Sequence, residues 1–294
     1  MAQRYFTKKN LLLIGLFGFI LWLAGTTVPP AYAETLDTLT VRYDPRISGN
    51  YAQLAATLDT TYVVEPDARG QNRIRVSDNG AAVTLAMIQA GLDAANAALL
   101  QDLGNGVWQL NAGLFIDTGV TLNLSPQHGV NELRLRSEAL VQAAGVTAAR
   151  TVTEPDGQQR TLAIDYSSFV SLITYDGVIN LDNVKVTSWD PAANGGAGGV
   201  DTDYTNGRAY ILAKYDAALN IRNSDIGYLG SADGESYGVS WRDVNSSAAP
   251  NVLRSRVTGE VLNSKFHHLY YGIYTYQASN MTFRGNQFYQ NIKY

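Results

Sequence analysis

Residues Ser264 to Tyr294 read SKFHHLYYGIYTYQASNMTFRGNQFYQNIKY, and their pattern recurs upstream. Four segments align: INLDNVKV from Ile179, LNIRNSDI from Leu219, GEVLNSKF from Gly259 and MTFRGNQF from Met281. All four carry an apolar residue at the third and last positions and Asn or Gly at the fifth. The segments start 40, 40 and 22 residues apart, which fits a coil of roughly 20 to 25 residues if two coils carry extra loop.

A repeat of this length, built from alternating apolar and polar residues, predicts a solenoid of short strands. In a parallel β-helix each strand pairs with the equivalent strand of the next coil. The turn between strands then needs a residue that tolerates a left-handed backbone. Asn183, Asn223, Asn263 and Gly285 stand at that position. We therefore predict an all-β parallel β-helix and assign these Asn residues to structure rather than to catalysis.

The composition agrees with an elongated β architecture. The chain has 294 residues, of which 46% are apolar and 16% charged, with 18 Tyr, 27 Gly and no Cys. The length is ample for a sizeable core. The absence of Cys excludes disulfides, zinc-thiolate sites and thiol nucleophiles. We predict no cofactor and no metal.

The first 33 residues have the form of an export signal. Three basic residues precede an apolar run from Leu11 to Gly25, and an Ala-Tyr-Ala sequence predicts cleavage between Ala33 and Glu34. The alternative is an uncleaved anchor, since residues 11–28 are uncharged and approach the length that spans a bilayer. Pro29 and Pro30 favour cleavage, and the bacterial form of the signal predicts a periplasmic or secreted protein.

Removal of this signal leaves 19 basic and 26 acidic residues, a net charge of −7, which disfavours nucleic acid as a partner. The region from Asn245 onward is different, because it contains five basic residues and one acidic residue. An anionic polymer could therefore bind at the C-terminal coils. The alternative is a solvated rim of alternating strand positions.

The region 34–106 is expected to precede the solenoid, which we assign to residues 107–294. Residues 84–102 have apolar side chains at helical spacing and predict a helix that caps the first coil. Residues 151–160 predict a protruding hairpin loop, and residues 190–207 a longer excursion. Asp201, Asp203 and Asn206 resemble part of a calcium loop, but Asn206 and Leu212 stand where the loop needs Gly and Glu.

Few residues could carry chemistry. His267 and His268 are adjacent, and on a continuous strand their side chains would point to opposite faces, so at most one is expected on a binding surface. His128 lies in a turn sequence. The tyrosines between Tyr270 and Tyr276 could stack against sugars, because aromatic faces pack on sugar C–H bonds while basic groups bind carboxylates. The candidate substrate-binding residues are Lys265, His268, Tyr271, Tyr274, Arg284 and Lys293.

The run HHLYYGIYTYQASNMTFRGNQFYQNIKY closely resembles the periplasmic mannuronan C-5 epimerases of bacterial alginate biosynthesis. The resemblance covers most of the chain after the signal, and this run is its most specific part. It implies a right-handed parallel β-helix that acts on polymeric β-D-mannuronate and inverts C-5 to give α-L-guluronate. It also implies an anionic polysaccharide as partner and a place in a periplasmic alginate export complex.

The same resemblance places the base and the groups that neutralise the substrate carboxylate in an Asp-Pro-His-Asp motif that follows Lys-Tyr-Gly. Lys293 and Tyr294 are present, but Asp-Pro-His-Asp occurs nowhere in the 294 residues. We therefore assign no catalytic residue and expect an N-terminal fragment that is inactive by itself. Such a fragment is expected to expose the edge of its last coil and to fold poorly.

Two other functions remain open. A polysaccharide lyase acting on alginate or pectin starts with the same abstraction of the C-5 proton, and then eliminates the 4-O-linked sugar. A β-helix can also serve as a non-catalytic polysaccharide-binding or export scaffold.

Overall fold

The computed structural model describes residues 60–66, 72–77, 82–137, 149–153, 159–163, 170–205, 207–232, 236–242 and 257–293. Within these ranges the strands form three long sheets and one separate hairpin. The export signal with its cleavage site at Ala33 and Glu34, together with Asn206 and Tyr294, lies outside the described residues. No helix in the described part is long and apolar enough to cross a membrane.

The three sheets are named here A, B and C. Sheet A contains, in spatial order, β1 (Thr61–Pro66), β2 (Asn72–Ser77), β6 (Gly113–Ile116), β11 (Ser171–Tyr175), β15 (Tyr210–Lys214), β18 (Val239–Arg242) and β21 (Tyr274–Tyr276). Sheet B contains β3 (Ala82–Val83), β7 (Thr121–Leu124), β12 (Val178–Asp182), β16 (Ala218–Arg222), β19 (Thr258–Leu262) and β22 (Met281–Arg284). Sheet C contains β4 (Leu100–Asp102), β5 (Val107–Leu110), β8 (Glu132–Arg136), β13 (Lys185–Asp190), β17 (Asp225–Gly227), β20 (Lys265–His267) and β23 (Gln287–Tyr289), with β14 (Gly199–Val200) beside β13.

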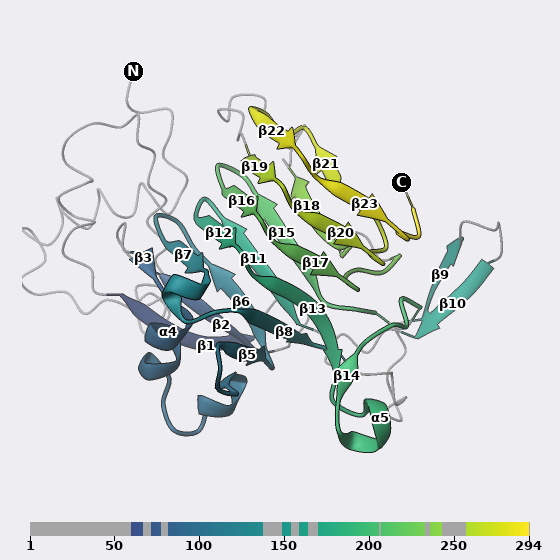
Figure 1. Ribbon diagram of the computed structural model, residues 1–294. Helices are drawn as coiled ribbons and strands as arrows, with labels where there is room; N and C mark the ends of the chain where they lie inside the picture. The colour runs from purple at the N-terminus through teal and green to yellow at the C-terminus, as the bar shows by residue number, and fades with distance from the viewer. Residues whose placement is uncertain are drawn as a thin grey trace, which may run out of the picture. The chain divides into compact units, whose positions relative to one another are not determined.

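The chain visits sheets A, B and C in turn, so one strand from each sheet makes a coil (Figure 1). Coils stack in parallel from β6–β7–β8 to β21–β22–β23. Ile179 pairs with Leu219, Leu219 with Gly259, and Gly259 with Met281. The spacings of 40, 40 and 22 residues are therefore one coil each, and the predicted parallel β-helix is confirmed.

The turn between sheets B and C has the backbone that the sequence predicted. Asn183, Asn223 and Asn263 have φ values of 56°, 52° and 50°, and Gly285 has φ 70°. These left-handed conformations suit Asn and Gly better than other residues. The four equivalent residues thus turn the chain at the same place in four successive coils.

Gly259 breaks the apolar pattern at the first position of the repeat, and the packing explains why. A side-chain carbon there would lie 2.3 Å from Nε1 of Trp241 and 2.4 Å from the carbonyl oxygen of Leu219. The Trp241 indole is fully buried and donates a hydrogen bond to that carbonyl at 3.1 Å. The indole of sheet A therefore fills the core volume that Ile179 and Leu219 fill in the preceding coils.

The predicted helix over residues 84–102 is present only as α4 (Leu85–Gly91). Its N-cap is Thr84, and its buried Leu85 and Ile88 join the core of the first coils. At Gly91 a side chain would collide with the Tyr62 ring, and Leu92 is already extended. The chain then forms a turn, the 3₁₀ helix η2 (Ala97–Leu99) and strand β4. The prediction was wrong about the second half, where apolar spacing alone could not reveal this break.

Two excursions leave the coils. Strands β9 (Ala149–Thr153) and β10 (Gln159–Ala163) pair in antiparallel fashion, which confirms the predicted hairpin. Residues 191–209 contain the short α5 (Ala193–Gly196) and β14, and account for much of the extra length in that coil. A further 3₁₀ helix, η3 (Pro126–His128), holds His128 in a turn, where its Nδ1 lies 2.7 Å from Oγ of Ser125.

The coil β21–β22–β23 is the last in the described part, and its inward side chains are open to solvent. Phe283 and Phe288 are 45% and 47% exposed, whereas the equivalent Val261 and Phe266 of the preceding coil are fully buried. Within the described residues, one side of these two rings therefore has no apolar partner, as expected for an edge coil.

Candidate functional site: imidazole and tyrosine groups after sheet C

The histidine pair lies where sheet C ends. Strand β20 ends at His267, and His268 has a left-handed backbone with φ 54°. The chain turns between the two residues, so both rings lie on the same side, with Nδ1 of His267 2.8 Å from Nδ1 of His268. The prediction that these side chains point to opposite faces was wrong because it assumed a strand that continues through His268.

The His267 ring lies over the neighbouring strand β17. A side-chain carbon on Gly227 would lie 2.3 Å from Cε1 of His267, so the ring occupies the space that this glycine leaves free. Its Nε2 lies 2.8 Å from Oδ1 of Asp225 on the same strand. The His267 imidazole is 14% exposed and the Asp225 carboxylate 43% exposed, so the imidazole is mostly covered by protein while the carboxylate is open to water.

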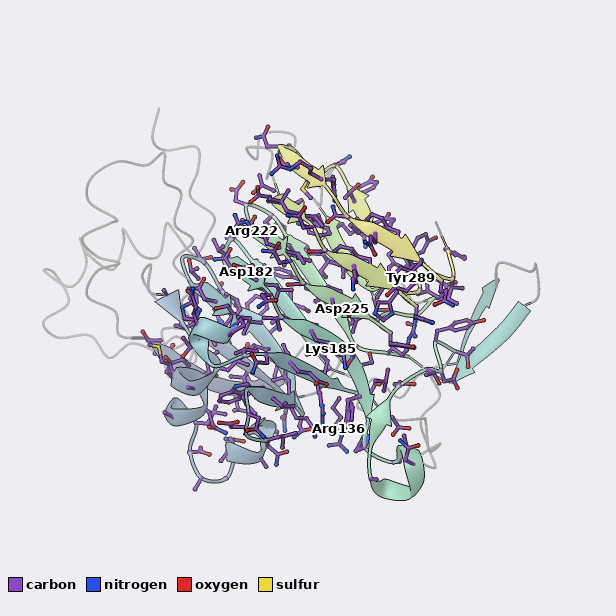
Figure 2. The ribbon with its side chains drawn as sticks, viewed as in Figure 1. Arg136, Asp182, Lys185, Arg222, Asp225 and Tyr289 are labelled. Atoms are coloured by element: carbon purple, nitrogen blue, oxygen red, sulfur yellow. The ribbon has the colours of Figure 1, made fainter. Side chains whose placement is uncertain are left out.

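Two tyrosines hold the imidazoles in place. Tyr228 stacks on His268 with ring centroids 4.4 Å apart and planes 9° apart. Tyr289 stacks on His267 at 5.1 Å and 14°. Figure 2 shows Asp225 and Tyr289 over sheet C, on strands β17 and β23. Because both imidazoles are stacked and hydrogen-bonded, their ring planes are fixed before any ligand arrives.

The electrostatics of this group favour the uncharged forms of His268 and Tyr289. Burial lowers the pKa of His268 from its ordinary value, and the charges of His267 and Arg208 lower it further. Burial also raises the pKa of Tyr289, with Asp225 and Tyr228 adding to the effect. Arg208 is 1% exposed and donates to the carbonyls of Leu229 and Gly230. Its burial lowers its own pKa to about 10.

A second group of aromatic rings follows in the chain. The ring of Tyr237 lies 4.9 Å from that of Tyr271 and 4.7 Å from that of Tyr274. Nζ of Lys293 lies 5.3 Å from the ring of Tyr270 and 5.8 Å from that of Tyr271. Tyr270 is buried, whereas Tyr271, Tyr274 and Lys293 are partly exposed. The rings of Tyr271 and Tyr274 and the ammonium group of Lys293 thus lie close together.

The two remaining predicted residues lie elsewhere on the coils. Lys265 is exposed on sheet C, in register between Asp225 and Gln287. Arg284 is the last residue of β22 in sheet B. In the part of the chain that the structure describes, Arg284 contacts none of the other candidates. The structure therefore groups Tyr271, Tyr274 and Lys293 and leaves Arg284 apart.

Sequence reasoning did not select Asp225, Tyr228 and Tyr289. The repeat spacing contained a signal, because Gly227, His267 and Tyr289 are equivalent positions 40 and 22 residues apart. A glycine beside two ring-bearing residues indicates that one ring lies over the strand of the other coil.

Sheet A carries another group that sequence reasoning did not select. Tyr175, Lys214, Arg242 and Tyr276 follow one another at equivalent strand positions in four coils. Nζ of Lys214 lies 5.7 Å from the Tyr175 ring, and the Arg242 guanidinium lies 5.9 Å from the Tyr276 ring. Each residue ends its strand, which is the shared feature that could have revealed the series.

The acidic turn that resembled a calcium loop is held by its own hydrogen bonds. Asp201 accepts from Ser137 Oγ at 2.5 Å and from the Asp203 amide, and Asp203 accepts from Thr205. Burial raises the pKa of Asp201. Among the described residues no three His, Cys, Asp or Glu side chains are grouped so that they could hold a metal ion.

In fold, this protein is a parallel β-helix like that of an alginate epimerase. A crystal structure of the periplasmic alginate epimerase AlgG superposes with a TM-score of 0.55 and 16% identity, over 90% of this chain and 56% of that one. A mutant of the same enzyme superposes with a TM-score of 0.53 and 19% identity, over 75% of this chain and 43% of that one.

In sequence, the resemblance to mannuronan C5-epimerases is confirmed. The enzyme of Pseudomonas fluorescens is 28% identical over 186 residues, which are 62% of this chain and 34% of that protein. The enzyme of Pseudomonas aeruginosa is 25% identical over 195 residues, 63% of this chain and 34% of that protein. The chain thus spans about a third of the length of these curated relatives. No protein-family model matches it.

Proposed function

We propose that this protein acts in the C-5 epimerisation of polymeric β-D-mannuronate to α-L-guluronate, and that the described coils bind the polymer. The observation that carries the proposal is the group of Tyr271, Tyr274 and Lys293 on a β-helix whose curated relatives are mannuronan C5-epimerases. Aromatic faces suit the C–H side of a sugar, and an ammonium group suits its carboxylate.

The reaction sets requirements that a complete active site must meet. The proton at C-5 is weakly acidic, so the neighbouring carboxylate must be neutralised before a base can remove it. An acid must then return a proton from the opposite face. Lys293 and Lys265 could neutralise carboxylates of bound sugars. We assign no residue of the described coils as the base, and we propose that these coils bind the polymer.

We further propose that the export signal of residues 1–33 takes the protein to the periplasm. The similar crystal structures are of a periplasmic epimerase, which supports this location. A growing alginate chain would meet the protein there, and an alginate export complex is the partner we propose.

Incubation of polymannuronate with the protein in heavy water tests the function. We expect α-L-guluronate residues that carry deuterium at C-5, detected by proton NMR. An unsaturated product absorbing in the near ultraviolet would instead indicate a lyase. An unchanged polymer, together with alginate secretion that depends on the protein, would favour the scaffold.

A further inference from the structure

The hydrogen bonds around the histidine pair fix where its hydrogens lie when both rings are uncharged. The Asp225 carboxylate can only accept, so the Nε2 atom of His267, 2.8 Å away, must carry a hydrogen. When His267 carries no charge, its other nitrogen, Nδ1, is an acceptor, whereas a charged His267 would donate from both nitrogens and reverse its bond to His268. The Nδ1 atom of His268, 2.8 Å from it, must therefore donate.

This chain of bonds determines the free end of His268. An uncharged His268 that carries its hydrogen on Nδ1 has a lone pair on Nε2. Within the described residues no donor reaches this Nε2, and the ring is only partly buried. The Tyr228 ring stacks on the face of the imidazole and restrains the orientation of its plane. The result is an oriented, uncharged acceptor on the surface.

We propose that Nε2 of His268 accepts a hydrogen bond from a sugar hydroxyl, so that Asp225, His267 and His268 form a carbohydrate subsite in addition to the Tyr271 and Lys293 group. The proposal rests on the proposed function in one respect, that the ligand is a saccharide. It adds that this subsite binds the sugar through a hydroxyl group and not through the carboxylate.

The chemistry of the surroundings favours a hydroxyl over a carboxylate. An ionised carboxylate can only accept hydrogen bonds, whereas a hydroxyl can donate one to the lone pair of Nε2. Of the charged groups around His268, Arg208 already donates to the Leu229 and Gly230 carbonyls, and the Asp225 carboxylate is bonded to His267. Carboxylates of the same polymer would instead be bound at Lys265 and Lys293.

Nitrogen-15 NMR of histidine-labelled protein tests the hydrogen placement without any ligand. Near neutral pH we expect His268 to show a protonated Nδ1 and an unprotonated Nε2. In the Asp225→Leu variant His267 loses its acceptor, and we expect a mixture of His268 tautomers. A hydrogen on Nε2 of His268 in the unmodified protein would overturn the proposal.

Binding of two matched ligands tests the subsite itself. Oligomers of mannuronate and uncharged oligomers of β-1,4-linked mannose carry the same ring hydroxyls. His268→Asn keeps a donor towards His267 but lacks Nε2, and His268→Phe keeps the stacking on Tyr228. We expect both variants to bind both ligands about three- to tenfold more weakly, as for one lost hydrogen bond, with an unchanged Tm for the Asn variant.

An effect confined to the mannuronate oligomers would show that the site reads a carboxylate, and would overturn the proposal. An absence of any effect, or an absence of binding by the unmodified protein, would also overturn it. The proposed function can fail separately. If the subsite effect is present but the heavy-water experiment gives no guluronate, epimerisation is wrong while the hydroxyl subsite stands.

Discussion

Gly227 is the residue on which the position of His267 depends, because the imidazole fills the space above its Cα. We expect Gly227→Ala to displace the ring, break its bond to Asp225 and destabilise the protein by about 1–3 kcal/mol. Denaturant unfolding measures this. The double variant Gly227→Ala with His267→Ala is the control, since without the ring the methyl group has room. An equal cost of Gly227→Ala in both backgrounds would contradict the account.

The lowered pKa of His268 predicts how stability depends on pH. Burial, with the charges of His267 and Arg208, lowers this pKa from 6.5, so the unfolded chain binds the proton more readily than the folded one. The stabilisation that this difference gives is present above the pKa of His268 in the unfolded chain. It is lost as pH falls through the pKa of His268 in the folded protein. We expect Tm to drop between about pH 7 and about pH 5, and to drop less in His268→Phe. Identical pH profiles for the two proteins would refute this.

At the residue scale the sequence predicts the turn residues better than the site. Asn183 and its equivalents follow from one repeated position, whose left-handed backbone only a few residue types tolerate. The His267 and His268 arrangement depends on where β20 ends, and a left-handed backbone is less typical of His than of the Asn and Gly that turn the chain between sheets B and C. Asp225 becomes a candidate only once the coils are stacked in register.

At the element scale, the turn between sheets B and C provides a test of the coil itself. Asn183 has φ 56°. We expect Asn183→Val to cost about 1–2 kcal/mol, because a branched side chain does not fit a left-handed backbone, and Asn183→Gly to change stability by less than about 0.5 kcal/mol. Denaturation midpoints at constant m-value measure both. Equal effects of Val and Gly would show that the turn does not constrain the coil.

Among the elements, those fixed by alternation were predictable and those fixed by packing were not. The strands of sheet B follow from apolar residues at every second position. The end of α4 depends on the Tyr62 ring beside Gly91, a contact between distant segments. Gly259 likewise departs from the repeat because Trp241, from another strand, occupies the core there.

At the scale of the whole molecule, the repeat predicts the β-helix because each coil buries its apolar residues only by stacking on its neighbours. The distribution of charge indicates an anionic partner for the C-terminal coils, where five of six charged residues are basic. Neither property identifies a reaction. That step depends on the resemblance to mannuronan C5-epimerases and on the tyrosine and lysine group.

Titration of the 294-residue chain with mannuronate oligomers tests the central claim most directly, with Lys293→Gln compared against Lys185→Gln. Lys185 serves as the control because its ammonium lies 3.7 Å from Glu132 in an earlier coil. The account predicts saturable binding that weakens with added salt, falls about three- to tenfold in Lys293→Gln and is unchanged in Lys185→Gln. An absence of saturable binding, or the same affinity in all three proteins, would contradict it.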